Sequence, residues 1–387
     1  MRSIFASLSV LCLCGIFTPS RTLLPAGEEA EDGFVPLFNG RDLSGWRNVN
    51  CSPSTWSVRD GIIISTGKPA GVLCSEKQYE NFVLELEWSH RVPKGNAGLF
   101  IWSDPITARG QPFTRSIEVQ VMDGVETPNY TSHGDIFSIH GARMKPDRPH
   151  PGGWERCLPS ERRAKPSPEW NQYRVTCIDG TLKLAVNGKE VSGGSEIRPR
   201  KGYICLESEG SECHFRNIRI KELPPSKTPL KPEEVAAVHE GFRSLYTGAD
   251  FSGWKLAAGG EGHWKVRDWS FEFDGKGETL RSEKDLGDFT LIADWQWPAK
   301  PADASLPIVF TDVKLLEVVA KLTAGAEARS GEWNRLVLTR AGQRATIEVN
   351  GQKLLPIQLA PGAGRTSFGL GRKGSAARFA NIYLKEP

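Results

Sequence analysis

The sequence predicts an all-β protein made of two tandem jelly-roll domains, each a β-sandwich of antiparallel sheets. Three observations support this fold class. The chain has 387 residues, enough for two or three domains. Short segments alternate polar and apolar residues between turns of Gly, Pro, Asn and Asp, whereas long helical periodicity is nearly absent. The motifs of the first half also recur in order in the second half.

The first element is the leader. Residues 1–20, "MRSIFASLSVLCLCGIFTPS", begin with Arg2, run apolar from Ile4 to Phe17 and end in small residues. This layout is typical of a secretory signal peptide, so we expect a secreted or periplasmic protein. A membrane anchor is the alternative, but the apolar run is shorter than a span, so no stable membrane span is expected.

The next observations concern partners and crosslinks. The formal net charge is only +3, and no basic cluster with interleaved aromatics occurs, so nucleic acid is not an expected partner. Outside the leader, the chain has an even set of cysteines that are disulfide candidates in an exported protein. They are Cys51, Cys74, Cys157, Cys177, Cys205 and Cys213. Cys205 and Cys213 flank a turn-like "ESEGSE" and could pair across a hairpin, but the sequence leaves the connectivity open.

The domain boundaries are set by the repeat. "FVPLFNGRDLSGW" at residues 34–46 recurs as "FRSLYTGADFSGW" at residues 242–254, and "EWNQYRVTCIDGTLKLAVNG" recurs as "EWNRLVLTRAGQRATIEVNG". We therefore expect a first domain at 33–223, a Pro-rich linker at 224–240 and a second copy, shorter in its middle, at 241–387. Tryptophans with partners in the other copy are expected in the core: Trp46, Trp56, Trp88 and Trp170.

Comparing the copies also indicates which one carries chemistry. "IEVQVMD" of the first copy aligns with "LEVVAKL" at residues 316–322, where Gln120 and Asp123 are replaced by Val319 and Leu322. Arg216 is replaced by Ala380. The segment around "SHGDIFSIHGA" has no counterpart. We therefore expect any active site in the first copy.

The strand predicted at "IEVQV", residues 117–121, carries the main candidates. Residues two apart share a face, so Glu118 and Gln120 point to the same side. Asp123 would join them only through a β-bulge near Met122, and the alternative is a simple Asp-Gly turn. Strand parity places His133 and His140 on opposite faces, and we favour His140 as a proton-transfer group. Asn96 precedes another strand and is either a turn residue or a sugar contact.

Two resemblances give this strand a chemistry. Its spacing resembles that of laminarinase-type jelly-roll glycosidases, in which carboxylates on one strand act as nucleophile and acid/base. The ordered series "FVPLFNGRDLSGW", "GNAGLFIW", "IEVQVMD", "VNGKEV" and "FRNIRIKEL" is more specific. It resembles the 3-keto-disaccharide hydrolase domain family, which has a concanavalin A-like jelly-roll fold. That resemblance covers nearly all of the first copy, whereas the second copy matches at its ends only and resembles a degenerate partner.

The resemblance implies cleavage of glycosides that carry a ketone at C3. The carbonyl acidifies the C2 proton, a base removes it, and the enolate expels the C1 substituent. By the family pattern, Glu118, Gln120 and Asp123 match "E-x-Q-x-x-D", Asn96 matches "N-x-G-x-F" and Arg216 matches "F-R-N-I". Glu118, His140 and Asp123 are then catalytic candidates, whereas Gln120, Asn96 and Arg216 are substrate contacts.

Further implications concern cofactors and specificity. Glu118 and Gln120 could hold a divalent cation, and no organic cofactor is expected. The sequence departs from the commoner family pattern at Ala97, where Ser is frequent, and in the long loop at 140–157, which we expect to reshape the substrate pocket. The second copy is a carbohydrate-binding module, a packing scaffold or an interaction domain.

The expected function is therefore a secreted enzyme that acts on a small saccharide or glycoside. Two alternatives stay open. One is a lectin-like protein that binds carbohydrate without cleaving it, because jelly rolls often do so. The other is an ordinary two-carboxylate glycoside hydrolase, in which Asp123 would be essential.

Overall fold

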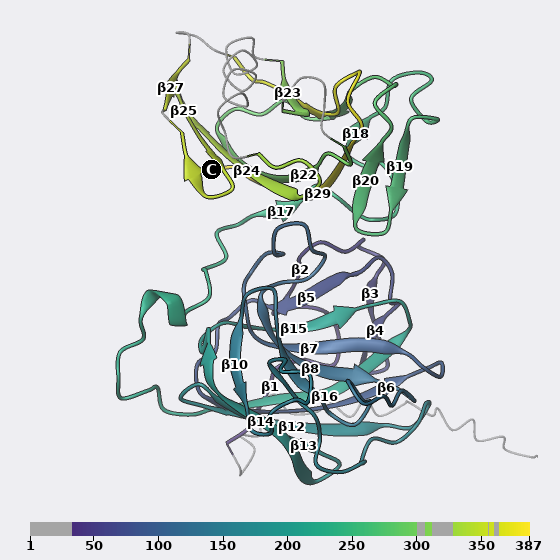
Figure 1. Ribbon diagram of the computed structural model, residues 1–387, viewed down its shortest axis with the longest axis vertical. Helices are drawn as coiled ribbons and strands as arrows, with labels where there is room; N and C mark the ends of the chain where they lie inside the picture. Colours follow the sequence, from purple (N-terminus) through teal and green to yellow (C-terminus); the bar gives the residue numbers. More distant parts are fainter. Residues whose placement is uncertain (1–32, 300–305, 312–327, 355, 360–363) are drawn as a thin grey trace, which may run out of the picture.

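The computed structural model describes residues 33–299, 306–311, 328–354, 356–359 and 364–387. The predicted signal peptide and the segment 316–322 lie outside the described residues. The protein has two lobes, of which the larger contains β1 to β16 and the smaller contains β17 to β29 (Figure 1). Both lobes are all-β, as the alternating sequence predicted.

The larger lobe is a sandwich of two antiparallel sheets. In the described part of the chain, its nine-stranded sheet runs in the order β10 (Arg143–Pro146), β14 (Lys189–Arg198), β13 (Thr181–Val186), β12 (Asn171–Ile178), β6 (Phe82–His90), β16 (Cys213–Glu222), β4 (Ile62–Ser65) and β3 (Trp56–Arg59), with β1 (Val35–Pro36) beside β16. Its seven-stranded sheet runs in the order β11 (Arg156–Cys157), β9 (Ile136–Ile139), β8 (Ser116–Met122), β7 (Asn96–Ser103), β15 (Tyr203–Ser208), β5 (Gly71–Ser75) and β2 (Trp46–Asn48).

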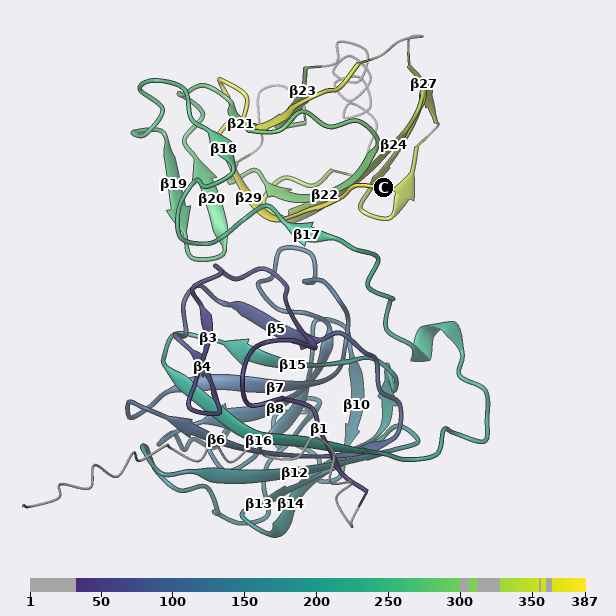
Figure 2. The ribbon, with the colours of Figure 1, turned by 180° about the vertical axis from the view of Figure 1, so that it is seen from behind.

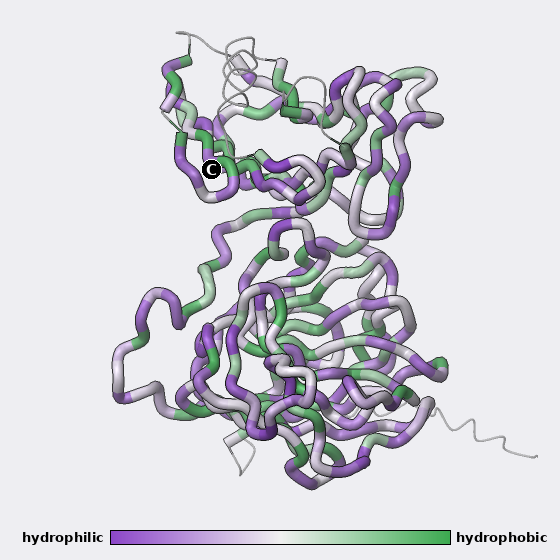
Figure 3. Tube along the Cα trace, in the orientation of Figure 1, coloured by the Kyte–Doolittle hydropathy of each residue, from purple (hydrophilic) through white to green (hydrophobic). Residues whose placement is uncertain are grey.

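The core of this lobe lies between the two sheets. Leu84, Leu86 and Trp88 of β6 pack with Leu99 of β7 and Val119 of β8, and each is almost completely buried. Apolar and polar residues alternate at short intervals along the chain, as the hydropathy trace shows (Figure 3). Because side chains alternate along a strand, the residues between these core positions point to the outer faces of the sheets. This alternation decides where polar side chains gather.

The smaller lobe repeats the sandwich with fewer strands. Counting only described residues, one sheet contains β19 (Trp264–Arg267), β20 (Ser270–Phe273), β29 (Ala377–Lys385), β22 (Phe289–Gln296), β24 (Trp333–Ala341), β25 (Arg344–Val349) and β26 (Gln352–Lys353), with β17 (Arg243–Ser244) beside β29 and β27 (Ile357–Gln358) beside β25. The other contains β18 (Trp254–Lys255), β21 (Leu280–Ser282), β28 (Phe368–Leu370) and β23 (Ile308–Phe310).

The repeat seen in the sequence recurs as equivalent hydrogen bonds. Trp46 Nε1 donates to the Leu37 carbonyl at 3.0 Å, and Trp254 Nε1 donates to the Leu245 carbonyl at 2.8 Å. Similarly, the Asn187 amide donates to Asn171 Oδ1 and the Asn350 amide donates to Asn334 Oδ1. The positions shared by the two copies therefore serve the fold.

The segment between the lobes is packed rather than free. It contains a single 3₁₀ turn, η1 (Pro232–Glu234), among its described residues. Arg200 pairs with Glu234 at 3.2 Å, and the Ala236 amide donates to the Lys201 carbonyl. The Pro-rich linker therefore runs along the first lobe before it enters β17 (Figure 2).

The two lobes share a buried contact. The Gly110 amide donates to Asp294 Oδ2 at 2.8 Å, and Thr107 Oγ1 lies 2.8 Å from the Tyr383 hydroxyl oxygen. An apolar cluster, which includes Phe100 of the first lobe with Ile292 and Tyr383 of the second, lies beside these bonds. The second lobe thus covers one edge of the outer face of the seven-stranded sheet.

Two sequence predictions need correction. The disulfide joins Cys74 to Cys205, which face each other on neighbouring strands β5 and β15, and does not join Cys205 to Cys213. The remaining candidates are unpaired and buried: Cys51, Cys157, Cys177 and Cys213. Trp170 is not a core residue, because it lies half-buried under the Arg216 guanidinium, 3.9 Å from its ring centroid. Trp46, Trp56 and Trp88 are buried as predicted.

Candidate active site

The site lies on the outer face of the seven-stranded sheet. In the strand register, Glu118 of β8 stands opposite Phe100 of β7 and Phe137 of β9. Phe100 in turn stands opposite Cys205, the disulfide partner of Cys74. Residues directly opposite each other share a face, so this row crosses the sheet on the side away from the core. Glu118 is only 6% exposed.

A second carboxylate lies beside Glu118. Gly98 of β7 separates Glu118 from Glu207 of β15. A Cβ atom at Gly98 would lie 3.1 Å from Glu118 Oε1 and 2.6 Å from Glu207 Oε2. Glu207 is 1% exposed, and its buried Oε2 atom has no hydrogen-bond partner among the described residues. The absence of a side chain at position 98 therefore lets the two carboxyl groups approach each other.

An amide pair connects this row to a third carboxylate. Gln120 Nε2 donates to Asn96 Oδ1 at 2.8 Å, and the Asn96 amide donates to Glu209. Gln120 and Asn96 were predicted from the sequence as substrate contacts. The structure brings them into one network with Glu118 as a neighbour on the same strand.

Arg156 supplies the positive charge of the site. Its guanidinium lies 3.7 Å from the Phe137 ring centroid, 3.6 Å from Asp135 Oδ2 and 3.5 Å from Gln120 Oε1. Arg156 begins β11, at the end of the segment 140–157 that the sequence predicts as a loop reshaping the pocket. The segment reaches the site through this side chain.

The surroundings shift the acidity of the carboxyl groups. Burial, together with the charge of Glu209, raises the pKa of Glu118 to about 8, although Arg156 opposes this shift. Burial and the neighbouring Glu118 raise the pKa of Glu207 well above its usual value. Burial also raises the pKa of Glu209, and the charge of Asp268 contributes. With a pKa of about 8, Glu118 can exchange a proton near neutral pH.

Asp123 does not belong to this group. β7 and β8 stay in register up to Met122, so no bulge turns Asp123 back toward Glu118. Instead, its two carboxylate oxygens accept the backbone amides of Lys94 and Ser167, both at 2.9 Å. Asp123 is buried and holds two loops together. The two-carboxylate arrangement of Glu118 with Asp123 is therefore absent.

Phe113 is the ring partner of His140, and Arg216 lies on the other sheet. His140 comes directly after β9 in a left-handed conformation, with φ at 52°, and its ring stacks at 6.5 Å on Phe113. Burial lowers its pKa. Arg216 lies on β16 of the other sheet, where it pairs with Glu87 at 2.8 Å. The strand order, which the sequence does not state, separates Arg216 from the site.

The predicted cation site has a poor ligand set. Among the described residues, no three His, Cys, Asp or Glu side chains are grouped as metal ligands. The Gln120 amide already donates to Asn96, and its oxygen faces the Arg156 guanidinium. A cation there would be repelled by Arg156, so Glu118 with Gln120 does not fit a divalent metal.

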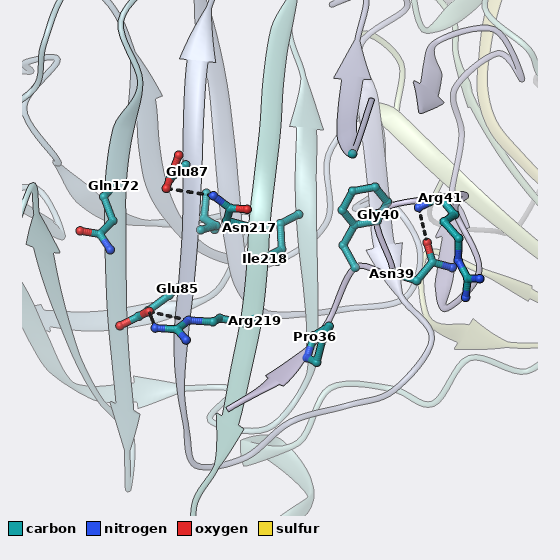
Figure 4. A pocket seen from close by; sticks show the side chains of 13 residues that line it. Pro36, Asn39, Gly40, Arg41, Glu85, Glu87, Gln172, Asn217, Ile218 and Arg219 are labelled. Atoms are coloured by element: carbon teal, nitrogen blue, oxygen red, sulfur yellow. Dashed lines mark hydrogen bonds and ion pairs between the residues drawn. The ribbon is translucent and has the colours of Figure 1, made fainter. Parts of the chain in front are cut away.

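The site borders a cavity between the two lobes. This cavity has a volume of about 640 Å³, and Glu209 and Phe113 form part of its wall. A larger groove of about 1180 Å³ lies on the opposite sheet (Figure 4). In that groove Glu85 pairs with Arg219, and Glu87 accepts a hydrogen bond from Asn217. The acidic groups there are already matched by partners, so the groove lacks the convergent carboxyl groups of the candidate site.

Sequence reasoning missed Glu207, Glu209 and Arg156. The signal for the glutamates was present in "ICLESE", where Glu207 and Glu209 alternate with Leu206 and Ser208. The sequence does not show which strand lies beside "GYICLES", and "ESEGSE" suggests a turn between Cys205 and Cys213. Arg156 could not be placed, because the sequence of residues 140–157 predicts a loop and does not show that the segment contains β10 and ends in β11.

The comparisons with known proteins cover mainly the first lobe. The sequence model of the 3-keto-alpha-glucoside-1,2-lyase-like domain matches residues 33–221. A 3-keto-disaccharide hydrolase of Bacteroides thetaiotaomicron is 24% identical over 244 residues, which is 50% of this chain and 79% of that protein. At this low identity, the matches support a hydrolase that acts on carbohydrate.

Two solved structures are similar to part of this chain. A Parabacteroides distasonis protein, provisionally called a glycosyl hydrolase, is 24% identical with a TM-score of 0.40, covering 52% of this chain and 99% of its own. The carbohydrate-binding module CBM66 from Bacillus subtilis is 12% identical with a TM-score of 0.34, covering 46% of this chain and 96% of its own. In the described residues, no helix is both long and apolar enough to span a membrane. The match over residues 33–221 contains Glu118, Glu207 and Glu209, and it supports the family of the 3-keto-alpha-glucoside-1,2-lyase-like domain for the first lobe.

Proposed function

We propose that the first lobe cleaves the glycosidic bond of 3-keto-glycosides, with Glu118 as the base that removes the C2 proton. The observation that carries the proposal is the convergence of Glu118, Glu207 and Glu209 on one sheet face beside Arg156. The name of the Bacteroides relative and the family match support the substrate class.

The chemistry depends on the ketone. Glu118 takes the C2 proton, and the electron pair of that C–H bond becomes an enolate on the C3 oxygen. When the enolate collapses, the C1–O bond breaks and the leaving group takes a proton from an acid. Water then adds at C1 while C2 regains a proton, so the net reaction is hydrolysis.

Each role has a residue that suits it. A carboxylate with a pKa of about 8 is a stronger base than an ordinary one, which favours removal of a carbon-bound proton. The Arg156 guanidinium can stabilise the enolate oxygen. Burial and the neighbouring Glu118 raise the pKa of Glu207 well above its usual value, which favours the protonated form that can donate a hydrogen bond or a proton. Residues 1–20 and the Cys74–Cys205 disulfide support export as part of the same proposal.

The test is turnover of a 3-keto-glucoside and of its unoxidised parent, each with and without chelator. We expect cleavage of the keto compound alone and exchange of its C2 proton for deuterium in heavy water, measured by NMR. Glu118→Gln should lower turnover on the order of 10²- to 10⁴-fold. Glu87→Gln, which changes a carboxylate on the opposite sheet, is the matched control and should keep activity.

Two outcomes would contradict the proposal. If neither compound turns over but saccharides bind, the lectin-like alternative is favoured. Cleavage of the unoxidised parent without C2 exchange would instead favour an ordinary glycoside hydrolase, with Glu118 and Glu207 as the carboxylate pair.

A further inference from the structure

The cavity beside Glu209 has walls from both lobes. The first lobe contributes Ser52, Ser54 and Glu209, whereas the second contributes Asp268 and Trp269. Its volume of about 640 Å³ is within the range of small-molecule sites. The second lobe therefore adds side chains to a cavity that adjoins the candidate active site.

Asp268 and Trp269 form the hairpin turn between β19 and β20. The equivalent turn of the first lobe, between β3 and β4, is Asp60-Gly61, where φ is 51° and 75°. Two successive positive φ angles favour Gly at the second position. In the second lobe Asp268 keeps a φ of 48°, but the φ angle of Trp269 is not positive. A large aromatic residue thus replaces the glycine of the repeat, and the needs of the turn do not explain it.

This turn is held firmly against the first lobe. Asp268 Oδ1 accepts the Ala70 amide at 2.9 Å, and Gly248 of the second lobe lies against Pro69. The Trp269 ring lies 5.4 Å from that of Trp333, and the Arg378 guanidinium lies 5.9 Å from its centroid. Trp269 is half-buried, so part of it stays available to the cavity. The wall is preorganised for binding.

The composition of the cavity suits a sugar ring. An aromatic side chain offers a flat face to the C–H groups of a sugar, while Ser52, Ser54 and the carboxylates offer hydrogen bonds to its hydroxyl groups. Hydrogen bonds also link the cavity to the reacting centre, because the Asn96 amide donates to Glu209 and the Gln120 amide donates to Asn96 Oδ1.

From these observations we infer that the second lobe supplies the subsite for the leaving-group sugar of a 3-keto-disaccharide, with Trp269 as its stacking platform and Asp268 as a hydrogen-bonding partner. This inference rests on the function proposed above for the first lobe. It assigns the shorter copy a role in substrate binding at the shared site.

The test is calorimetric binding by the full chain carrying Glu118→Gln, so that turnover does not interfere. The probes are a 3-keto-disaccharide, its unoxidised parent disaccharide, and a methyl 3-keto-glucoside that lacks the second sugar. We expect Trp269→Ala to weaken the binding of both disaccharides about tenfold and to leave the affinity for the methyl glycoside unchanged. Trp269→Phe should restore most of the affinity, because it keeps an aromatic face. Trp170→Ala, which changes a half-buried tryptophan just before β12 of the opposite sheet, is the matched control.

The outcomes separate this inference from the proposed reaction. If Trp269→Ala lowered the affinity for the disaccharides and the methyl glycoside equally, or lowered none of them, the subsite would be overturned. The subsite would also be overturned if the chain that carries Glu118→Gln alone bound neither disaccharide. If Trp269→Ala weakens both disaccharides while the unmutated chain turns over neither, the subsite stands and the proposed reaction fails.

Discussion

At the residue scale, the site depends on carboxyl groups that are forced together in a buried position. Gly98 allows Glu118 and Glu207 to approach, and the unpartnered Glu207 Oε2 shows that their arrangement does not serve stability. Buried ionisable groups without full pairing usually destabilise a fold and are retained for function. The residue pattern therefore predicts a conflict between stability and activity.

Glu118→Gln should stabilise the protein at alkaline pH. Because burial raises the pKa of Glu118 to about 8, the unfolded chain loses this proton from its usual pKa of 4.5 upward, whereas the folded chain keeps it. The free energy of unfolding that the protonated carboxyl contributes is therefore fully present below about pH 4.5 and is lost as the pH rises to about 8. The gain of the variant should reach on the order of 1–3 kcal/mol at pH 8, measured by urea unfolding between pH 5 and 8. Glu222→Gln, an exposed residue, is the control; a gain that does not grow with pH would contradict the assignment.

Arg156 should set the pH range of activity. Its charge lowers the pKa of Glu118, so Arg156→Gln should move the rise of turnover with pH to higher values. Arg156→Lys keeps the charge and should shift the profile less, although it loses the planar contact with Phe137. The measurement is kcat and kcat/KM from pH 6 to 10. A profile that falls with increasing pH would make Glu118 the acid instead of the base.

At the element scale, β7 and β8 locate the site, and Asp123 anchors the loops at the end of these strands. Asp123→Ala removes the acceptor of two backbone amides, at Lys94 and Ser167, and should destabilise the protein by about 1–3 kcal/mol. Turnover per folded molecule should remain close to that of the unmutated chain. Thermal unfolding together with kinetics checks this, and loss of chemistry without loss of stability would restore Asp123 as a catalytic candidate.

The Cys74–Cys205 disulfide also acts at the scale of elements, because it joins two strands. It links β5 to β15 across a sequence separation of 131, so it should stabilise the sheet mainly by restricting the unfolded chain. Cys74→Ala with Cys205→Ala should lower stability by about 2–5 kcal/mol. Cys157→Ala, which changes a buried unpaired cysteine, is a control for packing alone. Equal losses in the two variants would show that the crosslink contributes little.

At the scale of the whole molecule, the lobes act as one body through a few close contacts. Gly110 has a φ of 66°, and a Cβ there would overlap the Trp333 ring. Gly110→Val should therefore undock the lobes, splitting one calorimetric transition into two and exposing residues 224–240 to protease. Gly153→Val is the matched control, since Gly153 also has a positive φ but has nothing near its Cβ position. A single transition in Gly110→Val would mean that the lobes are coupled elsewhere.

The sequence determined the all-β class, the repeat, the shared Trp46 and Trp56 positions, and the face that Glu118 and Gln120 occupy. These come from local alternation and from comparison within one chain, both of which are properties of short segments. Tertiary structure decided the rest. Strand order moved Arg216 to the opposite sheet, register paired Cys74 with Cys205, and neighbouring strands brought Glu207 beside Glu118. The docking of the lobes placed Trp269 at the cavity of Glu209. These relations join residues far apart in the chain, and the pairing of distant strands depends on the packing of the whole sandwich, which local patterns do not specify.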